Sequence, residues 1–380
     1  MELSEIRAEL EKVDDRLLDD FLERMKLAGQ IATCKAEHDV PVADPGRERE
    51  TLERVRAKSD GLERYSDALY RQLFSLSRNY QNKLRTPEEG VSRMIADSLE
   101  RHAGEEFPAT ATVACPGVEG GNSQIASDRL FPRGNLVFIK TFEGVFDAVE
   151  GGLCDFGVVP VENSSNGSVR EVYELLQKKS VSIVRSARLF IKHELLARPG
   201  TRLEDVRKVY SHPQAFGQCS EFLSGLSSDV ELVPCDNTAE AARLVATSGE
   251  QGVAAIAPHE CVALYDLSVV SDHIQNNENN YTRFFCIARE AVVYPGSNRI
   301  SLVLTCKHRP GALYAIMGAF EALGINLLKL ESCPIPGEDF KFMFFFDLEA
   351  SVRDSEVRAM LSELERECET FLFLGNYLEV

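Results

Sequence analysis

The spacing of apolar residues changes twice along the chain, which divides it into three regions. In residues 1–86 the pattern is helical throughout, with no strand-like run. Steps of four and three residues alternate along a heptad seam made of Leu3, Arg7, Leu10, Asp14, Leu17, Phe21, Arg24, Ala28, Ile31 and Lys35. The seam predicts one helix over residues 4–37, ending before Pro41. Two shorter helices are predicted at 45–58 and 62–84.

The first predicted helix is much longer than the two helices predicted after it. At 1.5 Å per residue it measures about 50 Å. Two shorter helices cannot cover its whole apolar seam. We therefore expect a second copy of the chain to cover it, as an intertwined homodimer, and a tetramer is equally compatible with this pattern.

The middle region has a different pattern. After a predicted linker at 87–107, which contains a short helix at 91–102, short apolar runs alternate with amphipathic stretches. The runs predict strands at 137–141, 156–161, 181–184, 206–210, 230–234, 252–257 and 282–288. The stretches predict helices at 122–131, 143–150, 168–178, 213–224, 238–248 and 258–264. This alternation favours a largely parallel α/β sheet over residues 108–292, built as one domain or as two lobes.

The third region, residues 298–380, reads strand, helix, strand, strand, helix, strand. The elements are predicted at 300–306, 311–323, 325–333, 341–348, 354–367 and 370–378. This order is typical of the ferredoxin-like α+β arrangement. The sequence thus predicts a multidomain chain with an all-α, an α/β and an α+β domain.

Composition narrows the range of partners. The net charge of the 380 residues is -18, with 44% hydrophobic and 27% charged residues. Nucleic-acid binding needs a basic face, so we expect no such partner. The ten cysteines and seven histidines show no metal-ligand spacing, which argues against a metal site. No targeting segment and no membrane span is predicted, so we expect a cytoplasmic protein.

Charged residues interrupt the seam of the first helix. Arg24 and Lys35 lie on one face, about 16 Å apart along the axis. Buried cations are costly unless they are paired. Either these side chains reach the edge of the seam and form structural ion pairs, or they line a cavity for a small anion with two carboxylates. Ser77 and Gln81 supply an i, i+4 pair on the third helix.

These residues resemble the motif of an all-helical chorismate mutase. It is met by Arg7, Arg24, Lys35, Asp44-Pro45-Gly46-Arg47-Glu48 and Ser77-Arg78-Asn79-Tyr80-Gln81. The resemblance implies the rearrangement of chorismate to prephenate. This unimolecular step needs a held conformer and stabilised charge on the ether oxygen, but no nucleophile.

The resemblance also implies a role for each mutase residue. Lys35 and Gln81 bind the ether oxygen, Arg24 and Arg47 bind carboxylates, and Glu48 binds the hydroxyl. Ser77 lines the same site, and Arg7 serves the site of the partner chain. Asp44 either acts in the site or only caps its helix.

Three strand-to-helix turns in the middle region are rich in small polar residues, at 115–123, 162–168 and 210–216. Each places free N–H groups at a helix N-terminus, which suits a carboxylate, although Ser and Asn also cap helices routinely. A fourth stretch, Thr282-Arg283-Phe284, joins an amide-rich loop to an apolar strand. Together these segments predict a polar cleft.

The same segments resemble prephenate dehydratase over residues 108–292. The motifs are Asn163-Ser164-Ser165-Asn166-Gly167, Ser211-His212-Pro213-Gln214 and Thr282-Arg283-Phe284. The glycine turn departs from the family pattern, because Asn122 replaces an aromatic residue and leaves the packing of that wall open. The resemblance implies two lobes like those of a periplasmic binding protein, with the substrate between them. The implied substrate-binding residues are Asn163, Ser164, Ser165, Gly167, Ser211, His212, Gln214, Thr282, Arg283 and Phe284.

The implied reaction explains the threonine. Prephenate loses carbon dioxide and its ring hydroxyl together and becomes aromatic, so its poor leaving group needs a hydrogen-bond donor. The resemblance assigns that role to Thr282. Arg283 binds a carboxylate or holds the loop, and His212 is either an acid or, as we favour, a structural residue.

The third region resembles an ACT domain, a small regulatory amino-acid-binding module. The resemblance rests on Arg309-Pro310-Gly311-Ala312-Leu313 and on Glu331-Ser332-Cys333-Pro334, in which Cys333 stands where arginine is usual. It implies that L-phenylalanine binds at Gly311, Ala312, Leu313, Glu331 and Ser332 and inhibits the dehydratase.

The sequence therefore predicts a bifunctional enzyme of phenylalanine biosynthesis that converts chorismate through prephenate to phenylpyruvate. We expect it to need no cofactor and no metal. The alternative is a regulatory protein that binds an aromatic acid or amino acid in the same cleft without turnover.

Overall fold

The computed structural model describes residues 2–38, 40–84, 89–165, 167–307, 310–335 and 342–380. The chain divides into two compact units. Unit 1 comprises Met1–Arg101 and Asn298–Phe373, and unit 2 comprises His102–Ser297 and Leu374–Val380. Among the described helices, none is both long and apolar enough to cross a membrane. The boundaries predicted for the linker and the three domains stay a prediction.

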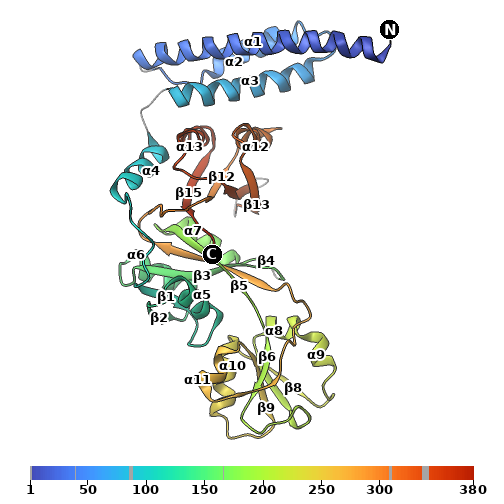
Figure 1. Cartoon of the computed structure of the whole chain (residues 1–380), viewed down its shortest axis with the longest axis vertical. Coiled ribbons are helices and arrows are strands. Elements are labelled where there is room, and N and C mark those ends of the chain that lie inside the picture. The colour runs from blue at the N-terminus through green and yellow to red at the C-terminus, as the bar shows by residue number, and fades with distance from the viewer. Residues whose placement is uncertain (1, 39, 85–88, 166, 308–309, 336–341) are drawn as a thin grey trace. The chain divides into compact units, whose positions relative to one another are not determined.

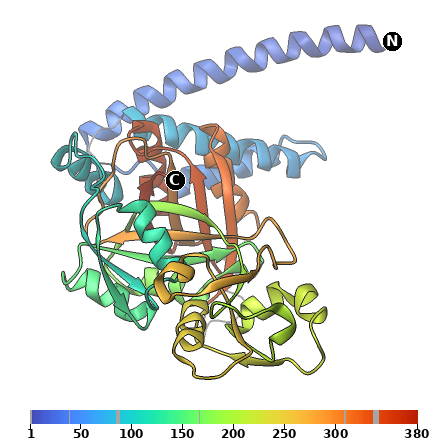
Figure 2. The same cartoon turned by 60° about the horizontal axis from the view of Figure 1, so that its bottom comes forward.

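Unit 1 begins with the helices that the heptad pattern predicts. They are α1 (Leu3–Glu37), α2 (Pro45–Arg56), α3 (Glu63–Leu84) and α4 (Gly90–Arg101). The backbone N–H of Glu2 donates to the Glu5 carboxylate at 2.8 Å, which caps the start of α1. The N-terminal part of α1 extends beyond α3 (Figures 1 and 2). Every residue of α1 from 3 to 20 is exposed, whereas Ala28 and Ala32 are buried.

The C-terminal part of unit 1 has the predicted strand and helix order. Its elements are β12 (Arg299–Thr305), α12 (Ala312–Ala322), β13 (Asn326–Pro334), β14 (Phe342–Glu349), α13 (Ser355–Glu367) and β15 (Thr370–Tyr377). The strands form one sheet in the order β13-β14-β12-β15, so β13 lies at an edge. Helix α13 contacts α3 and α4 within unit 1.

Unit 2 contains two sheets, so the two-lobe alternative is the correct one (Figure 1). The first sheet has the order β2-β1-β3-β11-β5, with β4 paired to β3. Its strands are β1 (Thr112–Pro116), β2 (Asn135–Ile139), β3 (Phe156–Asn163), β4 (Gly167–Ser168), β5 (Ser182–Phe190) and β11 (Tyr281–Ala288). Helices α5 (Asn122–Leu130), α6 (Phe142–Glu150) and α7 (Arg170–Lys178) belong to this lobe.

The second lobe is built on the sheet β10-β6-β9-β7-β8. Its strands are β6 (Glu194–Ala197), β7 (Lys208–Ser211), β8 (Glu231–Pro234), β9 (Val253–Ala257) and β10 (Ser268–Ser271). Its helices are α8 (Pro213–Gln218), α9 (Ser220–Ser224), α10 (Thr238–Thr247) and α11 (Glu260–Tyr265), with a 3₁₀ turn at Leu203–Asp205. Separate apolar cores fill the two lobes, around Phe131 and Phe284 in the first and around Leu196 and Ile256 in the second.

The prediction of a largely parallel sheet was wrong. Strand β11 runs antiparallel to both β3 and β5, and β6 runs antiparallel to both β9 and β10. The reason is that the chain enters the second lobe after β5 and returns to insert β11 into the first sheet. Only the βα-type connections, such as those that pair β1 with β2 and β7 with β8, give parallel neighbours.

Two crossover segments, residues 191–193 and 272–280, join the lobes and are hydrogen-bonded to each other. The N–H of Ile191 donates to the carbonyl of Asn280 at 2.8 Å, and that of Ile274 donates to the carbonyl of His193 at 3.3 Å. These bonds place the start of β11 beside the exit from β5. The two crossovers therefore run side by side between the lobes.

Candidate active sites

The helical part of unit 1 brings Arg24 of α1 against α3. Its guanidinium donates to the Ser77 hydroxyl and, at 3.1 Å, to the carbonyl of Leu73. Ser77 is buried, Arg24 is half-buried, and burial lowers the pKa of Arg24. The seam cation therefore faces inward and has neutral partners, as a site for an anion requires.

Two more predicted mutase residues lie further along the same helices. Lys35 is half-buried and its ammonium donates to the carbonyl of Val42 at 2.5 Å. Gln81 is buried with its side-chain Oε1 lacking a hydrogen-bond partner among the described residues. Gly29 approaches Tyr80 and Leu84, which shows that this part of α1 faces the C-terminal part of α3. The structure thus places Arg24 and Ser77 in the contact between α1 and α3, with Gln81 buried one turn further along α3, while Lys35 contacts the loop after α1 at Val42.

The other predicted mutase residues are not gathered in the same way. Asp44 caps α2, because its Oδ1 accepts the N–H of Arg47 at 3.0 Å. The Arg47 side chain is exposed and pairs with Glu50 at 2.9 Å. Arg7 is exposed, seventeen residues before Arg24 in α1 and hence about 26 Å from it along the axis. A single chain therefore leaves Arg7 and Arg47 outside the contact between α1 and α3 that contains Arg24 and Ser77.

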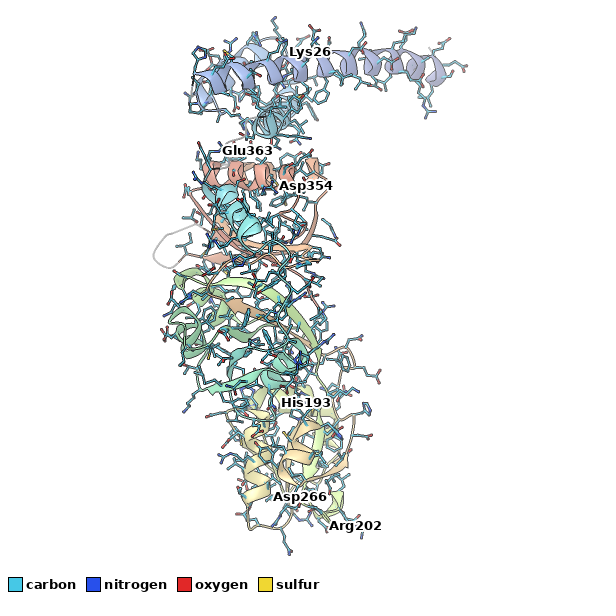
Figure 3. All side chains as sticks on the ribbon, turned by 60° about the vertical axis from the view of Figure 1, so that its left-hand side comes forward. Lys26, His193, Arg202, Asp266, Asp354 and Glu363 are labelled. Atoms are coloured by element: carbon cyan, nitrogen blue, oxygen red, sulfur yellow. The ribbon has the colours of Figure 1, made fainter. Side chains whose placement is uncertain are left out.

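Glu48 pairs with Arg78, a residue to which the sequence analysis assigned no role. Arg78 of α3 contacts Glu48 of α2 and also Glu363, at 2.8 Å, and Glu367, at 2.9 Å, of α13. Burial opposes the charge of Arg78, but the three carboxylates outweigh it and raise its pKa. Burial raises the pKa of Glu363 to about 7 against the opposing effect of Arg78. Figure 3 labels Glu363 on the helix of this cluster.

Unit 2 contains a cavity of about 350 Å³ lined by residues of both lobes. Of the predicted dehydratase residues, Asn163, His212, Gln214, Thr282 and Phe284 line it. None of the described lining residues is lysine or arginine. Negative groups of a ligand must therefore be held by hydroxyl, amide and backbone N–H donors. The first turn of α5, at Asn122 and Ser123, supplies such donors at a helix N-terminus, whereas the N–H of Gly121 donates to the carbonyl of Val118.

Strand pairing brings Asn163 and Thr282 together. Asn163 ends β3 and is directly opposite Thr282 in the antiparallel pair with β11. The Asn163 amide Nδ2 donates to Thr282 Oγ1 at 3.0 Å and to Asn280 Oδ1 at 3.1 Å. Both Asn163 and Thr282 are buried with only 9% of their surface exposed.

A backbone N–H fixes the direction of these bonds. The N–H of Ser165 donates to Asn163 Oδ1 at 3.0 Å, so this oxygen accepts and Nδ2 must be the donor. Thr282 Oγ1 is then an acceptor in its bond to Asn163. Its own hydrogen is left to donate into the cavity.

Arg283 points to the other face of the sheet, because successive residues of a strand alternate. Its guanidinium pairs with Glu379 at 2.7 Å and donates to the Tyr377 hydroxyl at 2.9 Å and to Ser186 Oγ at 3.3 Å. It is 5% exposed and does not line the cavity. Of the two roles predicted for Arg283, the geometry supports holding the structure together and does not support binding a substrate carboxylate.

The remaining described residues of the dehydratase motifs lie near the cavity but do not line it. Ser211 is fully buried and donates to the carbonyl of Ile256 at 2.8 Å, while Ser164 Oγ accepts the N–H of Tyr281 at 3.0 Å. Gly167 adopts a φ of +77° in the hairpin of β3 and β4. Ser165 lines a neighbouring amide-rich hollow. None of Ser164, Gly167 and Ser211 lines the cavity. Asn166 lies outside the described residues.

His212 caps α8. Its Nδ1 accepts the N–H of Gln214 at 3.2 Å, and burial, opposed by Asp236, lowers its pKa. A neutral ring that accepts at Nδ1 carries its hydrogen on Nε2. The imidazole therefore has a structural role at Nδ1 and still offers an N–H beside the cavity.

The glycine turn lies where the lobes meet. Gly120 has a φ of +88°, and a Cβ there would lie 3.0 Å from both Cys261 Sγ and Leu264 Cδ2 of α11. The Tyr265 hydroxyl donates to the carbonyl of Glu119 at 3.0 Å. The turn departs from its family pattern at Asn122, yet it still begins α5 and lines the cavity.

Sequence reasoning missed three polar residues around Thr282. They are Asn280, Gln218 at the end of α8, and His193 in the first crossover. Gln218 Oε1 accepts from Asn280 Nδ2 at 3.1 Å and from the ring of His193 at 2.8 Å, and Gln218 Nε2 is 3.4 Å from Asn163 Oδ1. The only sequence signal is the run of amides at 275–280 before Thr282, which the prediction treated as a loop.

The predicted effector residues lie at two places in the C-terminal sheet. Gly311, with a φ of +79°, precedes α12, and Ala312 and Leu313 open that helix. Glu331 and Ser332 lie on the edge strand β13, where Glu331 pairs with Lys329 at 3.2 Å. Arg309 of the same motif lies outside the described residues.

These features give the protein two candidate sites for small anions, one between helices of unit 1 and one between the α/β lobes of unit 2. The chorismate mutase type II family matches residues 6–82, and the prephenate dehydratase family matches residues 113–292. The bifunctional chorismate mutase/prephenate dehydratase of Escherichia coli is 32% identical over 98% of this chain and 95% of its own length. That of Aquifex aeolicus is 29% identical over 99% and 98%. The chain belongs to the bifunctional chorismate mutase/prephenate dehydratase family.

Solved structures also resemble about 70% of the chain. Prephenate dehydratase of Arthrobacter aurescens in complex with L-Phe has a TM-score of 0.64 at 26% identity, over 70% of this chain and 89% of that one. GqqA, described as a quorum-quenching acylase, has a TM-score of 0.63 at 27% identity, over 71% and 98%. The enzyme thus has a chorismate mutase domain and a prephenate dehydratase domain, and the alternative of a purely regulatory binding protein is not supported.

Proposed function

We propose that Thr282 donates a hydrogen bond to the leaving ring hydroxyl of prephenate in the dehydratase site. The observation that carries this proposal is the bond from Asn163 Nδ2 to Thr282 Oγ1, which leaves the threonine hydrogen as a donor into the cavity. As carbon dioxide leaves, the electrons of its bond enter the ring. The C–O bond pair departs with the oxygen, which takes up one proton to become water. Thr282 supplies that proton or relays it from solvent.

The carboxylates of prephenate find neutral donors in this cavity. The first turn of α5 and the Gln214 side chain are the groups that we assign to them. Phe284 lies on the same face of β11 as Thr282 and lines the cavity, where it would pack against the ring of prephenate. Helix N-termini stabilise anions through their free N–H groups, so a lysine or arginine is not required.

A chorismate assay tests the two activities together. Wild type should convert chorismate to phenylpyruvate, which is followed by its absorbance. Thr282→Ala should lose at least about 90% of the dehydratase kcat and keep the mutase, while Thr282→Ser, which retains the hydroxyl, should stay well above Thr282→Ala. A Thr282→Ala variant with more than about a tenth of wild-type kcat contradicts the assignment.

The mutase site is assembled in a dimer in this proposal. Arg24, Lys35, Ser77 and Gln81 come from one chain, and Arg7 comes from the second copy that covers the exposed N-terminal part of α1. The support is the position of Arg7, too far along the helix to reach its own chain's site, and the unsatisfied Oε1 of Gln81. Arg47 and Glu48 join the site when chorismate binds, and Glu48 then exchanges Arg78 for the substrate hydroxyl.

Residues 298–380 form a ferredoxin-like ACT domain that binds L-phenylalanine and inhibits the dehydratase. The strand and helix order and the sheet order β13-β14-β12-β15 support this. The backbone N–H groups of Ala312 and Leu313 hold the carboxylate, and the exposed edge strand β13, with Leu328 and Leu330 about 40% exposed, meets a second copy. A thiol at Cys333 cannot form the ion pair of an arginine, so inhibition should be weaker than is usual for the family.

Titration with L-phenylalanine tests the regulatory proposal. Dehydratase rate, mutase rate and the dimer–tetramer distribution are measured in parallel. If millimolar phenylalanine neither binds nor slows the dehydratase, the domain serves assembly only. No disulfide joins any of the ten cysteines, all of which lie in the described part of the chain, and this supports a location in the reducing cytoplasm.

A further inference from the structure

His193 occupies a position that the proposed chemistry has not used. It lies in the crossover from β5 to β6, only 3% exposed, and it lines the same cavity as Thr282 and Asn163. Figure 3 labels it at the junction of the two lobes of unit 2. Its backbone N–H donates to Gln275 Oε1 of the return crossover at 3.2 Å. The backbone of His193 is therefore tied to the return crossover, whereas its ring contacts Gln218 of α8 at 2.8 Å.

The hydrogen-bond network assigns the ring its tautomer. Because Ser165 N–H fixes Asn163 Oδ1 as an acceptor, Asn280 Oδ1 accepts from Asn163 and Asn280 Nδ2 must donate to Gln218 Oε1. That oxygen is 2.8 Å from His193 Nε2, which must then carry the hydrogen. Burial, opposed by the bond to Gln218, lowers the pKa of His193 and keeps the ring neutral.

The opposite nitrogen is consequently a lone-pair acceptor. His193 Nδ1 is buried and has no hydrogen-bond partner among the described residues. A buried polar atom without a partner costs free energy, and such atoms in native proteins usually have a functional explanation. The cavity holds a substrate whose ring carries one hydroxyl group, so one hydroxyl hydrogen is available to an acceptor.

We propose that His193 Nδ1 accepts the hydrogen of the ring hydroxyl of prephenate while the Thr282 hydroxyl donates to the same oxygen. The inference rests on the proposed role of Thr282. No proton moves to His193. The bond instead turns a lone pair of the leaving oxygen toward Thr282, which is the orientation that departure as water requires. The aromatic product has no hydroxyl, so it leaves Nδ1 unsatisfied again and loses this contact.

Two isosteric substitutions separate the nitrogens of the ring. His193→Gln keeps an amide donor near the position of Nε2 and removes the acceptor at Nδ1. His193→Asn keeps an acceptor near Nδ1 and removes the donor to Gln218. Both variants are measured in the full-length protein, with prephenate as substrate and phenylpyruvate as product inhibitor. Mutase activity and the melting temperature control for folding.

If the contact exists, His193→Gln lowers kcat/KM for prephenate by about tenfold, the scale of one lost hydrogen bond, and leaves the phenylpyruvate Ki within about twofold of wild type. His193→Asn should keep the wild-type ratio of prephenate binding to phenylpyruvate binding. Its kcat should be lower, because Gln218 loses the donor at Nε2. An unchanged kcat/KM in His193→Gln overturns the inference. An equal loss of prephenate and phenylpyruvate binding overturns it too, because it indicates a structural role. Both results differ from failure of the proposed role of Thr282, in which Thr282→Ala keeps more than about a tenth of the wild-type kcat.

Discussion

At the residue scale, the dehydratase site depends on the direction of hydrogen bonds more than on charge. The sequence predicted Thr282 and Asn163 through two motifs, at 163–167 and 282–284, that resemble those of prephenate dehydratase. It did not predict Asn280, Gln218 or His193, since single polar residues in loops and at helix ends carry no periodic signal. Their roles appear only when the fold places them in one network with Thr282. Arg283 shows the reverse, because strand alternation turns the cation next to Thr282 away from the cavity.

His212 provides a prediction at this scale. Asparagine is a strong N-cap, so His212→Asn should keep the cap on α8 and retain dehydratase kcat within about threefold of wild type. His212→Ala removes the cap and should cost about 1 kcal/mol of stability. Steady-state rates and melting curves of both variants check this. If His212 were the acid, His212→Asn would lose about a hundredfold or more in kcat despite normal stability.

At the element scale, the predicted helices were confirmed where apolar periodicity was strong, as in α1, α3 and α10, with ends shifted by at most one residue. The strands β1, β4, β6 and β10 were missed. Length alone does not explain this, because β7 and β8 are also only four residues long and were predicted at 206–210 and 230–234. The helix predicted at 213–224 is two helices, α8 and α9, which meet at Cys219. The direction of the strands could not be predicted from the sequence either. The antiparallel pairs of β11 arise because the chain returns from the second lobe into the first sheet.

The turn before α5 gives the prediction for elements. Gly120→Ala places a methyl group against Cys261 and Leu264 in addition to straining a positive φ. Gly200, with a φ of +90° and open space around it, is a matched control. Gly200→Ala should lower the free energy of unfolding by about 1–2 kcal/mol. Gly120→Ala should lower it further and also reduce kcat/KM for prephenate, because it pushes the lobes apart at the cleft. Equal effects on stability and activity in both variants would show that the contact between the lobes is unimportant.

At the scale of the whole molecule, the order of the three regions and the family could be predicted because each region carries its own motif. The cluster of Arg78 with Glu48, Glu363 and Glu367 could not, since it joins residues nearly 300 positions apart. Glu363 sits in this cluster with its Oε2 unpartnered among the described residues. Burial therefore makes its ionisation unfavourable in the folded protein, although Arg78 lies beside it.

This cluster predicts a pH dependence of stability. The pKa of Glu363 rises from 4.5 to about 7 on folding, so between these values the folded protein holds a proton that the unfolded chain releases. The contribution is fully present below pH 4.5 and is lost as pH rises through about 7. The free energy of unfolding of wild type should thus fall relative to Glu363→Gln over this window, by at most about 3 kcal/mol. Urea melts at several pH values measure the difference, and parallel curves for the two proteins would contradict it.

Assembly of the mutase site between chains gives the last prediction. Arg7 lies about 26 Å along α1 from Arg24, so its own chain cannot deliver it to the site that contains Lys35. Lys35→Ala should reduce mutase activity about a hundredfold, and Arg7→Ala should also reduce it strongly, while both variants keep the dehydratase activity.

In a dimer with one chain of each variant, one site regains both Arg7 and Lys35 and the other loses both. Co-expression of the two chains with different tags gives about half hybrid dimers, so about a quarter of the sites should be active. Arg16→Ala, an exposed change on the same helix, should leave the mutase unaffected. If purified hybrids are no more active than the parent variants, each chain builds its mutase site alone, and the exposed length of α1 serves only to hold the dimer together.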